Sequence, residues 1–246
     1  MKFSFSSTAP KDKNTALVSW KKQKESQVLV LPGGQKNIVL GVAGPEKMTR
    51  RKLIILARQI ITLAKANQVK KIALKLEDFS FPKAKVSKEE IAEMFATNFL
   101  MADFEFVKYK SKPKEGWNLV EGVVFVGNIN PGLKKAVAKG KLVGEEVNAC
   151  RVLANTPGGE MTPNVLAREA AKAARGTGIK IKIFGPREME RLKMGGVLGV
   201  AKGAEEKPAF IVMEYLKGGK AKPIVLVGKG VTFDSGGLQI KPGEGM

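Results

Sequence analysis

Apolar and polar residues alternate in short blocks along the first half of the chain. The apolar blocks predict strands, because they are rich in β-branched residues and are separated by polar or Pro-Gly-Gly turns. The predicted strands cover residues 16–20, 27–31, 37–43, 71–76 and 122–127. Because helical patterns fall between the strands, this half of the chain is predicted to be a small α/β domain.

Two of the intervening segments have the apolar period of a helix. In the first, apolar residues lie on one face of a helix with 3.6 residues per turn, at Leu53, Leu56, Ala57, Ile60, Ile61 and Ala64. The second covers 89–99, and Ser87 is a suitable N-cap for it. A longer and more polar helix is predicted over 132–153, where it would connect two domains.

A second α/β domain is predicted to follow. Thr162 and Pro163 have the residue types of an N-cap and a first helical position, so a helix is expected from there to about residue 174. A short helix is predicted at 186–192, and strands are predicted at 179–184, 197–201, 209–215 and 223–231. The last two are strongly apolar, which is typical of strands covered on both faces.

The predicted organisation is therefore a domain over 1–131, a connecting helix over 132–153 and the start of a second domain over 154–246. Because a doubly wound sheet usually contains more strands than this second domain supplies, we expect the sequence to be a piece of a longer protein. No apolar run reaches the roughly 18 residues of a transmembrane helix, and none is predicted.

Composition narrows the possible chemistry. The chain contains no histidine, which excludes the Ser-His-Asp triad, the Cys-His dyad and the HExxH zinc site. Its one cysteine, Cys150, cannot form an internal disulfide, fits a reducing cytoplasm and is expected to be a small core residue. Catalysis would have to use lysine, arginine, carboxylates, a metal-bound water or backbone N–H groups.

Net charge suggests a different class of function. The chain carries 43 Lys and Arg against 23 Asp and Glu, a net charge of +20, and such chains can bind the phosphates of nucleic acid. The excess is spread along the sequence, and its densest clusters, 21–24 and 50–52, lack interleaved aromatic residues for base stacking. A basic nucleic-acid-binding module remains the alternative to an enzyme.

The segment that could carry catalysis closes the most apolar of the predicted strands. It reads Val-Gly-Lys-Gly-Val-Thr-Phe-Asp-Ser-Gly-Gly over 227–237, and with the downstream Lys241-Pro242 we call it the signature segment, residues 227–242. The spacing of its residues does not match the P-loop, the dinucleotide-binding fingerprint or the serine nucleophile elbow. What remains is Lys229, Asp234 and Lys241, and spacing alone favours an ordinary structural turn over a metal site.

The signature segment closely resembles the signature of the leucyl aminopeptidases, the cytosolic family of two-metal exopeptidases. Two further stretches resemble parts of the same family's catalytic domain: 155–163, with Asn-Thr-Pro and Thr-Pro, and 194–203, with Met-Gly-Gly-Val-Leu-Gly-Val-Ala-Lys-Gly. The first half of the chain is similar to the family's macro-like domain, though less specifically. The resemblance implies an N-terminal macro-like α/β domain followed by an incomplete α/β/α catalytic domain.

The resemblance also implies roles for three residues. Lys229 would ligate one of two divalent ions, manganese or zinc, Asp234 would bridge both ions, and Lys241 would stabilise the oxyanion without ligating. Two such ions activate a bound water and polarise the scissile carbonyl, and this chemistry needs no histidine. A neutral lysine is a demanding ligand, since deprotonation from a reference pKa of about 10.4 costs about 4–5 kcal/mol at neutral pH.

The implied activity is release of N-terminal amino acids such as leucine from peptides, in the cytoplasm, by a protein that forms hexamers at full length. The family's further carboxylate ligands and its catalytic arginine would follow Met246. Two ligands are too few for two metals, so we expect these 246 residues to be inactive and to bind divalent metal weakly.

Overall fold

The structure is a computed structural model that describes residues 1–245, and the chain divides into two compact units, Met1–Arg151 and Val152–Met246. The first unit contains β1 (Lys2–Ser6), β2 (Thr15–Lys21), β3 (Gln27–Val30), β4 (Lys36–Gly41), α1 (Arg50–Ala66), β5 (Lys71–Lys75), α2 (Lys88–Asp103), β6 (Gly122–Val126) and most of α3 (Pro131–Asn155). Short 3-10 turns lie at η1 (Pro45–Lys47), η2 (Leu76–Phe79) and η3 (Pro82–Ala84). No helix among the described residues is long and apolar enough to cross a bilayer.

The strands of this unit form one mostly parallel sheet. Their order is β1-β6-β5-β2-β4-β3, and only the edge strand β3 runs antiparallel to its neighbour. The five strands predicted from sequence are confirmed, and the predicted α/β class with them. Strand β1 is not among the strands predicted from sequence. It alternates lysine or serine with phenylalanine and stacks Phe3 and Phe5 near Phe125.

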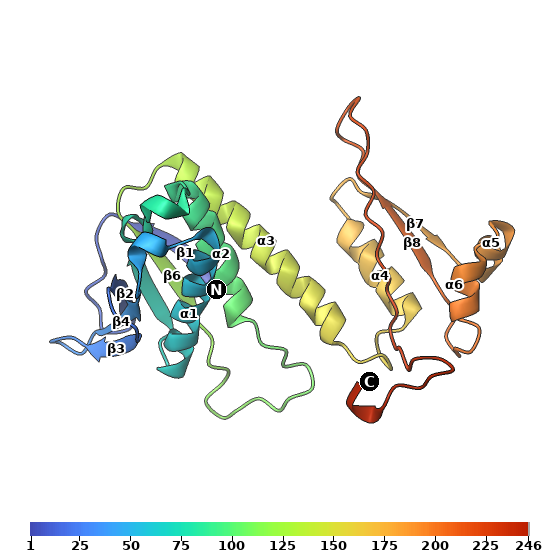
Figure 1. Cartoon of the computed structure of the whole chain (residues 1–246), viewed down its shortest axis with the longest axis horizontal. Helices are drawn as coiled ribbons and strands as arrows, with labels where there is room; N and C mark the ends of the chain where they lie inside the picture. Colours follow the sequence, from blue (N-terminus) through green and yellow to red (C-terminus); the bar gives the residue numbers. More distant parts are fainter. Residues whose placement is uncertain (246) are drawn as a thin grey trace. The chain divides into compact units, whose positions relative to one another are not determined.

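Helices α1 and α2 cover the sheet with the apolar faces that the sequence predicts (Figure 1). The six periodic residues of α1 are all buried, and Thr49 caps the helix by accepting a hydrogen bond from the N–H of Lys52. Helix α2 begins with a full capping box between Ser87 and Glu90, which confirms the predicted N-cap. The core cluster that these helices complete consists of residues between Ala16 and Val137.

Helix α3 packs on α2 through glycines. At Gly140 a Cβ would collide with the backbone carbonyl of Glu93, and at Gly144 it would lie 2.9 Å from Cβ of Leu100. The close approach lets the Thr97 hydroxyl donate to the Gly140 carbonyl at 3.0 Å. The predicted helix is present, but its first half belongs to the packing of the first unit, because glycine there allows two helix backbones to come close.

The second unit contains α4 (Pro163–Ala174), β7 (Lys180–Phe184), α5 (Pro186–Arg191), α6 (Gly195–Val200), β8 (Phe210–Glu214) and the 3-10 turn η4 (Gly243–Gly245). Thr162 caps α4 and Pro163 occupies its first turn, as predicted. The strand predicted at 197–201 is wrong, because the chain there closes helical bonds such as Leu198 N–H to the Met194 carbonyl. A short apolar run does not distinguish a strand from a helix.

Burial of the last two apolar runs was also predicted wrongly. Strand β8 pairs antiparallel with β7 in a two-stranded sheet and is largely exposed or half-buried. The run at 223–231 forms no strand, and four consecutive side chains in it are at least 76% exposed: Ile224, Val225, Leu226 and Val227. No described strand pairs with this segment, so its β-forming residues have no ladder to join.

Candidate metal and peptidase site

The signature segment lies in the second unit against the residues that precede α4. A Cβ at Gly158 would lie 2.7 Å from the carbonyl oxygen of Thr232, so only glycine allows the two backbones to approach. Farther along the segment, a Cβ at Gly230 would lie 3.3 Å from the side chain of Leu166 on α4. The two stretches that suggested one family in the sequence, 155–163 and 227–242, therefore contact each other.

Asp234 and Lys241 form an ion pair within this segment. Lys241 Nζ lies 2.9 Å from Asp234 Oδ2, and both side chains keep substantial exposure, 38% and 49% respectively. The other carboxylate oxygen, Oδ1, accepts a hydrogen bond from the Gly236 N–H at 3.0 Å. The structure thus brings together two of the three residues singled out from the sequence.

The backbone between these two residues turns sharply. The Lys241 N–H donates to the Ser235 carbonyl at 2.8 Å, which closes the loop. Gly236 and Gly237 have φ angles of 96° and 74°, and a Cβ at Gly236 would collide with the Gln239 carbonyl. The adjacent glycines are required by this turn, since side chains disfavour positive φ. The ordinary structural turn that spacing favours is therefore present.

Electrostatics in the turn favour the ionised carboxylate. The hydrogen bond from Lys241 holds the pKa of Asp234 below its usual range, and the Gly236 N–H acts in the same direction. The positive charge of Lys229 also lowers the pKa of Asp234, by a smaller effect. Lys229 is exposed, and neither it nor Asp234 is enclosed in apolar packing.

The residues present do not make a complete metal site. An ionised, accessible aspartate suits a hard divalent cation, but its two neighbours here are lysines, which repel a cation unless they lose a proton. Among the described residues, no three His, Cys, Asp or Glu side chains are grouped so that they could hold a metal ion. No catalytic step through metal ions follows from these residues alone.

Two other candidate groups have ordinary roles. Glu145 and Glu146 lie exposed on α3, and Glu145 faces Lys141 at 3.6 Å, four residues earlier on the helix. Cys150 was expected in the core, but it is exposed on the same helix, because Asn148 and Arg151 occupy the face that contacts the first unit, through the Leu100 and Met101 carbonyls, and Cys150 lies off that face. Apolar residues such as Val147 and Val152 lie on both sides of Cys150 in the sequence, so composition gives no signal of its exposure.

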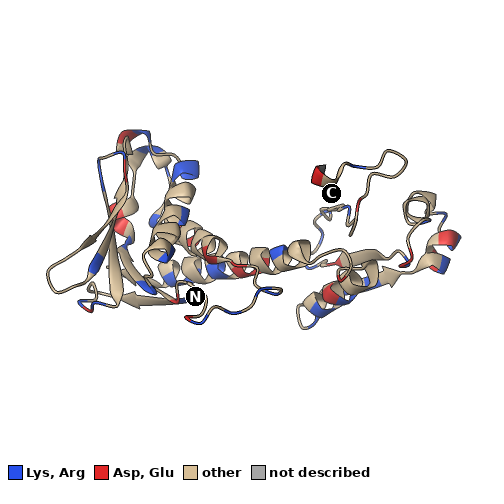
Figure 2. Ribbon diagram, turned by 90° about the horizontal axis from the view of Figure 1, so that it is seen from below, with Lys and Arg blue, Asp and Glu red and all other residues tan. Residues whose placement is uncertain are grey.

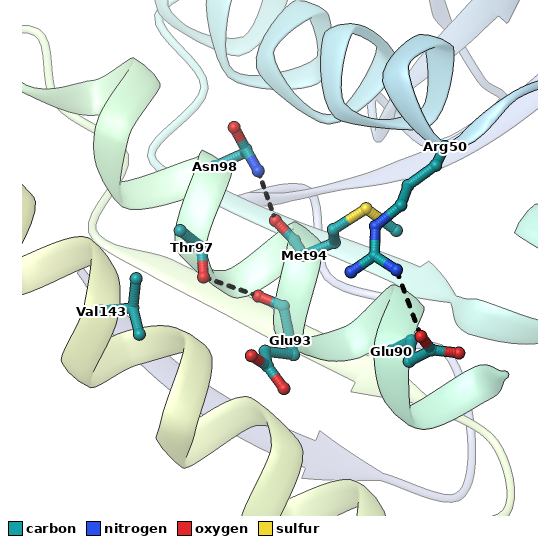
Figure 3. A pocket seen from close by; sticks show the side chains of 7 residues that line it. All are labelled: Arg50, Glu90, Glu93, Met94, Thr97, Asn98 and Val143. Carbon is teal, nitrogen blue, oxygen red and sulfur yellow. Dashed lines mark hydrogen bonds and ion pairs between the residues drawn. The ribbon is translucent and has the colours of Figure 1, made fainter. Parts of the chain in front are cut away.

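A cavity of about 210 Å³ lies in the first unit between α1, α2 and α3, and Figure 3 shows its lining. Its polar groups bond to one another. Arg50 lies 3.2 Å from Glu90, the Asn98 amide donates to the Met94 carbonyl, and the Thr97 hydroxyl donates to the Glu93 carbonyl. Because its polar side chains have partners within the protein, this cavity is structural packing.

Comparison with known proteins identifies relatives for both halves of the chain. Residues 148–246 match the catalytic domain of the cytosol aminopeptidase family, and residues 21–113 match the N-terminal domain of the same family. Probable cytosol aminopeptidases of Burkholderia mallei and Burkholderia pseudomallei are 43% identical over 148 residues, which cover 58% of this chain and 29% of the relative. The match thus spans less than a third of the length of these relatives.

Solved structures show the same fold. The bottromycin maturation enzyme BotP, in complex with Mn, superposes with a TM-score of 0.73 at 22% identity, over 94% of this chain and 50% of that one. A tomato leucine aminopeptidase variant gives 0.71 at 21% identity, over 85% of this chain and 50% of that one. At these identities the likeness establishes the fold.

Proposed function

Because the chain belongs to the cytosol aminopeptidase family, we propose that it carries the N-terminal domain and the first part of the catalytic domain of an aminopeptidase. The substrates are peptides, from which N-terminal residues such as leucine are released. The observation that carries the proposal is the signature segment, which lies in the part matched to the family's catalytic domain and presents Asp234, ionised, on an exposed turn.

Within this proposal, Lys229 and Asp234 supply two of the ligands of a pair of divalent ions, manganese or zinc. Support for a divalent metal comes from the family and from the BotP structure, which contains Mn. Lys241 does not ligate. It contributes a positive charge, and the support for its place is the 2.9 Å ion pair between its Nζ and Asp234 Oδ2. An ammonium at that position would also lie near an oxyanion formed beside the ions.

Because Lys229 and Asp234 are only two ligands for a pair of ions, we propose that the 246 residues alone do not hydrolyse peptides. The domain division at 1–131, 132–153 and 154–246 remains part of this proposal, as do the hexamer of a full-length enzyme and its cytoplasmic location. The exposed apolar run at 224–227 is consistent with a sheet that has further elements, because such side chains are otherwise costly to leave in water.

The test uses the whole chain with manganese. We expect no release of p-nitroaniline from leucine p-nitroanilide, and weak Mn²⁺ binding, measured by water proton relaxation, that is reduced in Asp234→Asn. The matched control is Asp78→Asn, which removes an exposed carboxylate of the first unit. Turnover comparable to that of a complete aminopeptidase would contradict the inactivity, and equal Mn²⁺ binding by the two variants would contradict the role of Asp234.

The second candidate, a nucleic-acid-binding module, is favoured by the net charge of +20. Figure 2 shows lysines and arginines on elements of both units, with acidic residues interspersed among them. Binding to duplex DNA that falls steeply between low and moderate salt and depends on base sequence would support this function. Weak binding without base preference would leave the aminopeptidase proposal as the better account.

A further inference from the structure

A second group of chemically active side chains lies at the amino edge of the six-stranded sheet. A cavity of about 470 Å³ is bounded by the residues that enter β2, β4 and β5 and by the turn that ends α1. These strands are parallel neighbours, with Thr15 paired to Lys71 and Leu17 paired to Asn37, so their first residues meet at one edge. Ligands of α/β sheets usually bind at the opposite, carboxyl edge.

The cavity is lined by lysines and carries no carboxylate in its lining. Six of its polar side chains matter here: Lys13, Lys36, Lys70, Lys71, Asn14 and Gln68. Asp12 precedes Lys13 in the sequence, and the Glu121 N–H donates to the Lys70 carbonyl at 2.7 Å, but neither residue lines the cavity. Four like charges around one cavity repel one another, and a bound anion would relieve that repulsion.

The partners of the four ammonium groups do not neutralise them. Lys36 Nζ donates to the Asn67 carbonyl at 2.7 Å, and Lys70 Nζ donates to the Trp117 carbonyl at 3.3 Å, and both acceptors are uncharged. Lys13 and Lys71 have no ion-pair partner within residues 1–245. Among residues 1–245, no ion pair therefore neutralises any of these four lysines.

The end of α1 fixes one wall of the cavity. The Val69 N–H donates to the Ala64 carbonyl at 2.8 Å, and Gln68 takes the left-handed conformation at φ 56°, as in the turn that commonly ends helices. This turn places Gln68 in the lining beside Val69 and Lys70. The amides of Gln68 and Asn14 add neutral hydrogen-bond donors to the charged ones.

We propose that this cavity binds a compact polyphosphate, either inorganic triphosphate or the phosphate chain of a nucleotide. Several closely spaced negative charges match four ammonium groups, and lysine is a common phosphate ligand. No aromatic ring lines the cavity, so a base would find nothing to stack on. Its lining is dominated by polar residues, unlike the apolar pockets that hold hydrophobic ligands, and none of it belongs to the signature segment.

The test measures binding of sodium triphosphate to the whole chain by titration calorimetry at low salt. The double variant Lys13→Gln/Lys71→Gln should bind triphosphate at least about tenfold more weakly, because it loses two charge-assisted contacts. The control Lys22→Gln/Lys24→Gln removes the same charge from exposed positions outside the cavity and should bind within about twofold of wild type. Equal weakening in both double variants would overturn the proposal, since it would show a general charge effect.

Two further arms identify the source of the phosphate. If ATP binds as tightly as triphosphate and is weakened by the same double variant, the phosphate chain is the recognised group. ATP binding that the double variant leaves unchanged would contradict the proposal. A 20-base-pair duplex that binds more tightly than triphosphate, and is weakened by the same variant, would overturn it in favour of nucleic acid. Thermal unfolding of each variant confirms that it is folded.

Discussion

At the scale of single residues, the turn in the signature segment has a structural role, and it also presents a carboxylate that could bind metal. Asp234 accepts hydrogen bonds on both carboxylate oxygens, from Gly236 and from Lys241, and it remains exposed. Their chemistry was suggested from sequence by the resemblance of the segment to the leucyl aminopeptidase signature, since spacing alone favoured an ordinary turn. Their pairing could not be predicted, because it depends on the positive φ at Gly236 and Gly237, which brings residue 241 back to residue 234.

The ion pair makes a prediction about titration. Lys241→Gln should raise the pKa of Asp234 toward that of a free aspartate, because the principal hydrogen bond to the carboxylate is lost. A carboxyl whose pKa is lowered in the folded protein stabilises it above the unfolded pKa, and this effect disappears as pH falls through the lowered pKa. Carboxyl NMR titration measures the change, with Lys229→Gln expected to give a smaller rise. An unchanged Asp234 pKa in Lys241→Gln would exclude the pair in solution.

In contrast to Asp234, Asp103 has a pKa that is raised in the folded protein. Burial raises the pKa of its carboxyl, although Oδ1 accepts a hydrogen bond from the Val120 N–H at 2.9 Å. Asp103→Ala should lower the free energy of unfolding by about 1–3 kcal/mol, since it leaves that buried N–H without a partner. Asp103→Asn retains an acceptor and removes a buried charge, so chemical denaturation near pH 7 should show a smaller loss.

The raised pKa also fixes a pH trend for Asp103. The folded state binds the proton more tightly than the unfolded state, so the contribution of Asp103 to stability falls as pH rises from its unfolded pKa through its folded pKa. Asp103→Asn should remove this part of the pH dependence. If Asp103→Asn kept the same pH dependence of stability as the parent chain, the raised pKa would have no consequence for folding.

At the scale of elements, periodicity and caps predicted most helices and strands, because these signals are local. Helices α2 and α4 begin where Ser87 and Thr162 predict, and α1, predicted from its period alone, is capped by Thr49. The errors fall where the deciding interaction is not local. The run at 223–231 has the residues of a buried strand, but a strand needs a neighbour, and the described residues provide none.

The capping box of α2 predicts a measurable loss of stability. Ser87→Ala removes the oxygen that accepts the Glu90 N–H at 3.1 Å, and it should lower the free energy of unfolding by about 1 kcal/mol. Ser111→Ala, in an exposed loop, serves as the control and should change the stability by less than about 0.5 kcal/mol. Urea denaturation compares the two, and equal values would contradict the capping role.

At the scale of the whole molecule, the two units differ in how much they bury. The core cluster lies entirely in the first unit, whereas the second has few buried residues and exposes many large apolar side chains. Composition indicated enough apolar residues for a core, and the halves of the sequence are similarly apolar in appearance. The difference in burial between the two units could not be predicted, because it depends on which strands pair with one another.

This difference predicts that residues 1–151 fold alone. The fragment retains the complete core cluster, so its thermal unfolding should be cooperative, with a Tm within about 5 °C of the main transition of the whole chain. Calorimetry of the fragment and the chain provides the comparison. A fragment without a cooperative transition would show that the first unit depends on residues 152–246 for its stability.

The central claim is that Asp234 belongs to an aminopeptidase site, and one measurement tests it most directly. In a chimera, residues 148–246 replace the corresponding part of the Burkholderia mallei relative, and Mn²⁺-dependent hydrolysis of leucine p-nitroanilide is assayed. We expect the chimera to be active. Its kcat/KM should fall at least about a hundredfold in Asp234→Asn, because loss of a residue that only supports a metal ligand already lowers activity by up to that factor. The exposed control Glu205→Gln should leave kcat/KM unchanged. An Asp234→Asn chimera that hydrolyses the substrate as fast as its parent would contradict the claim.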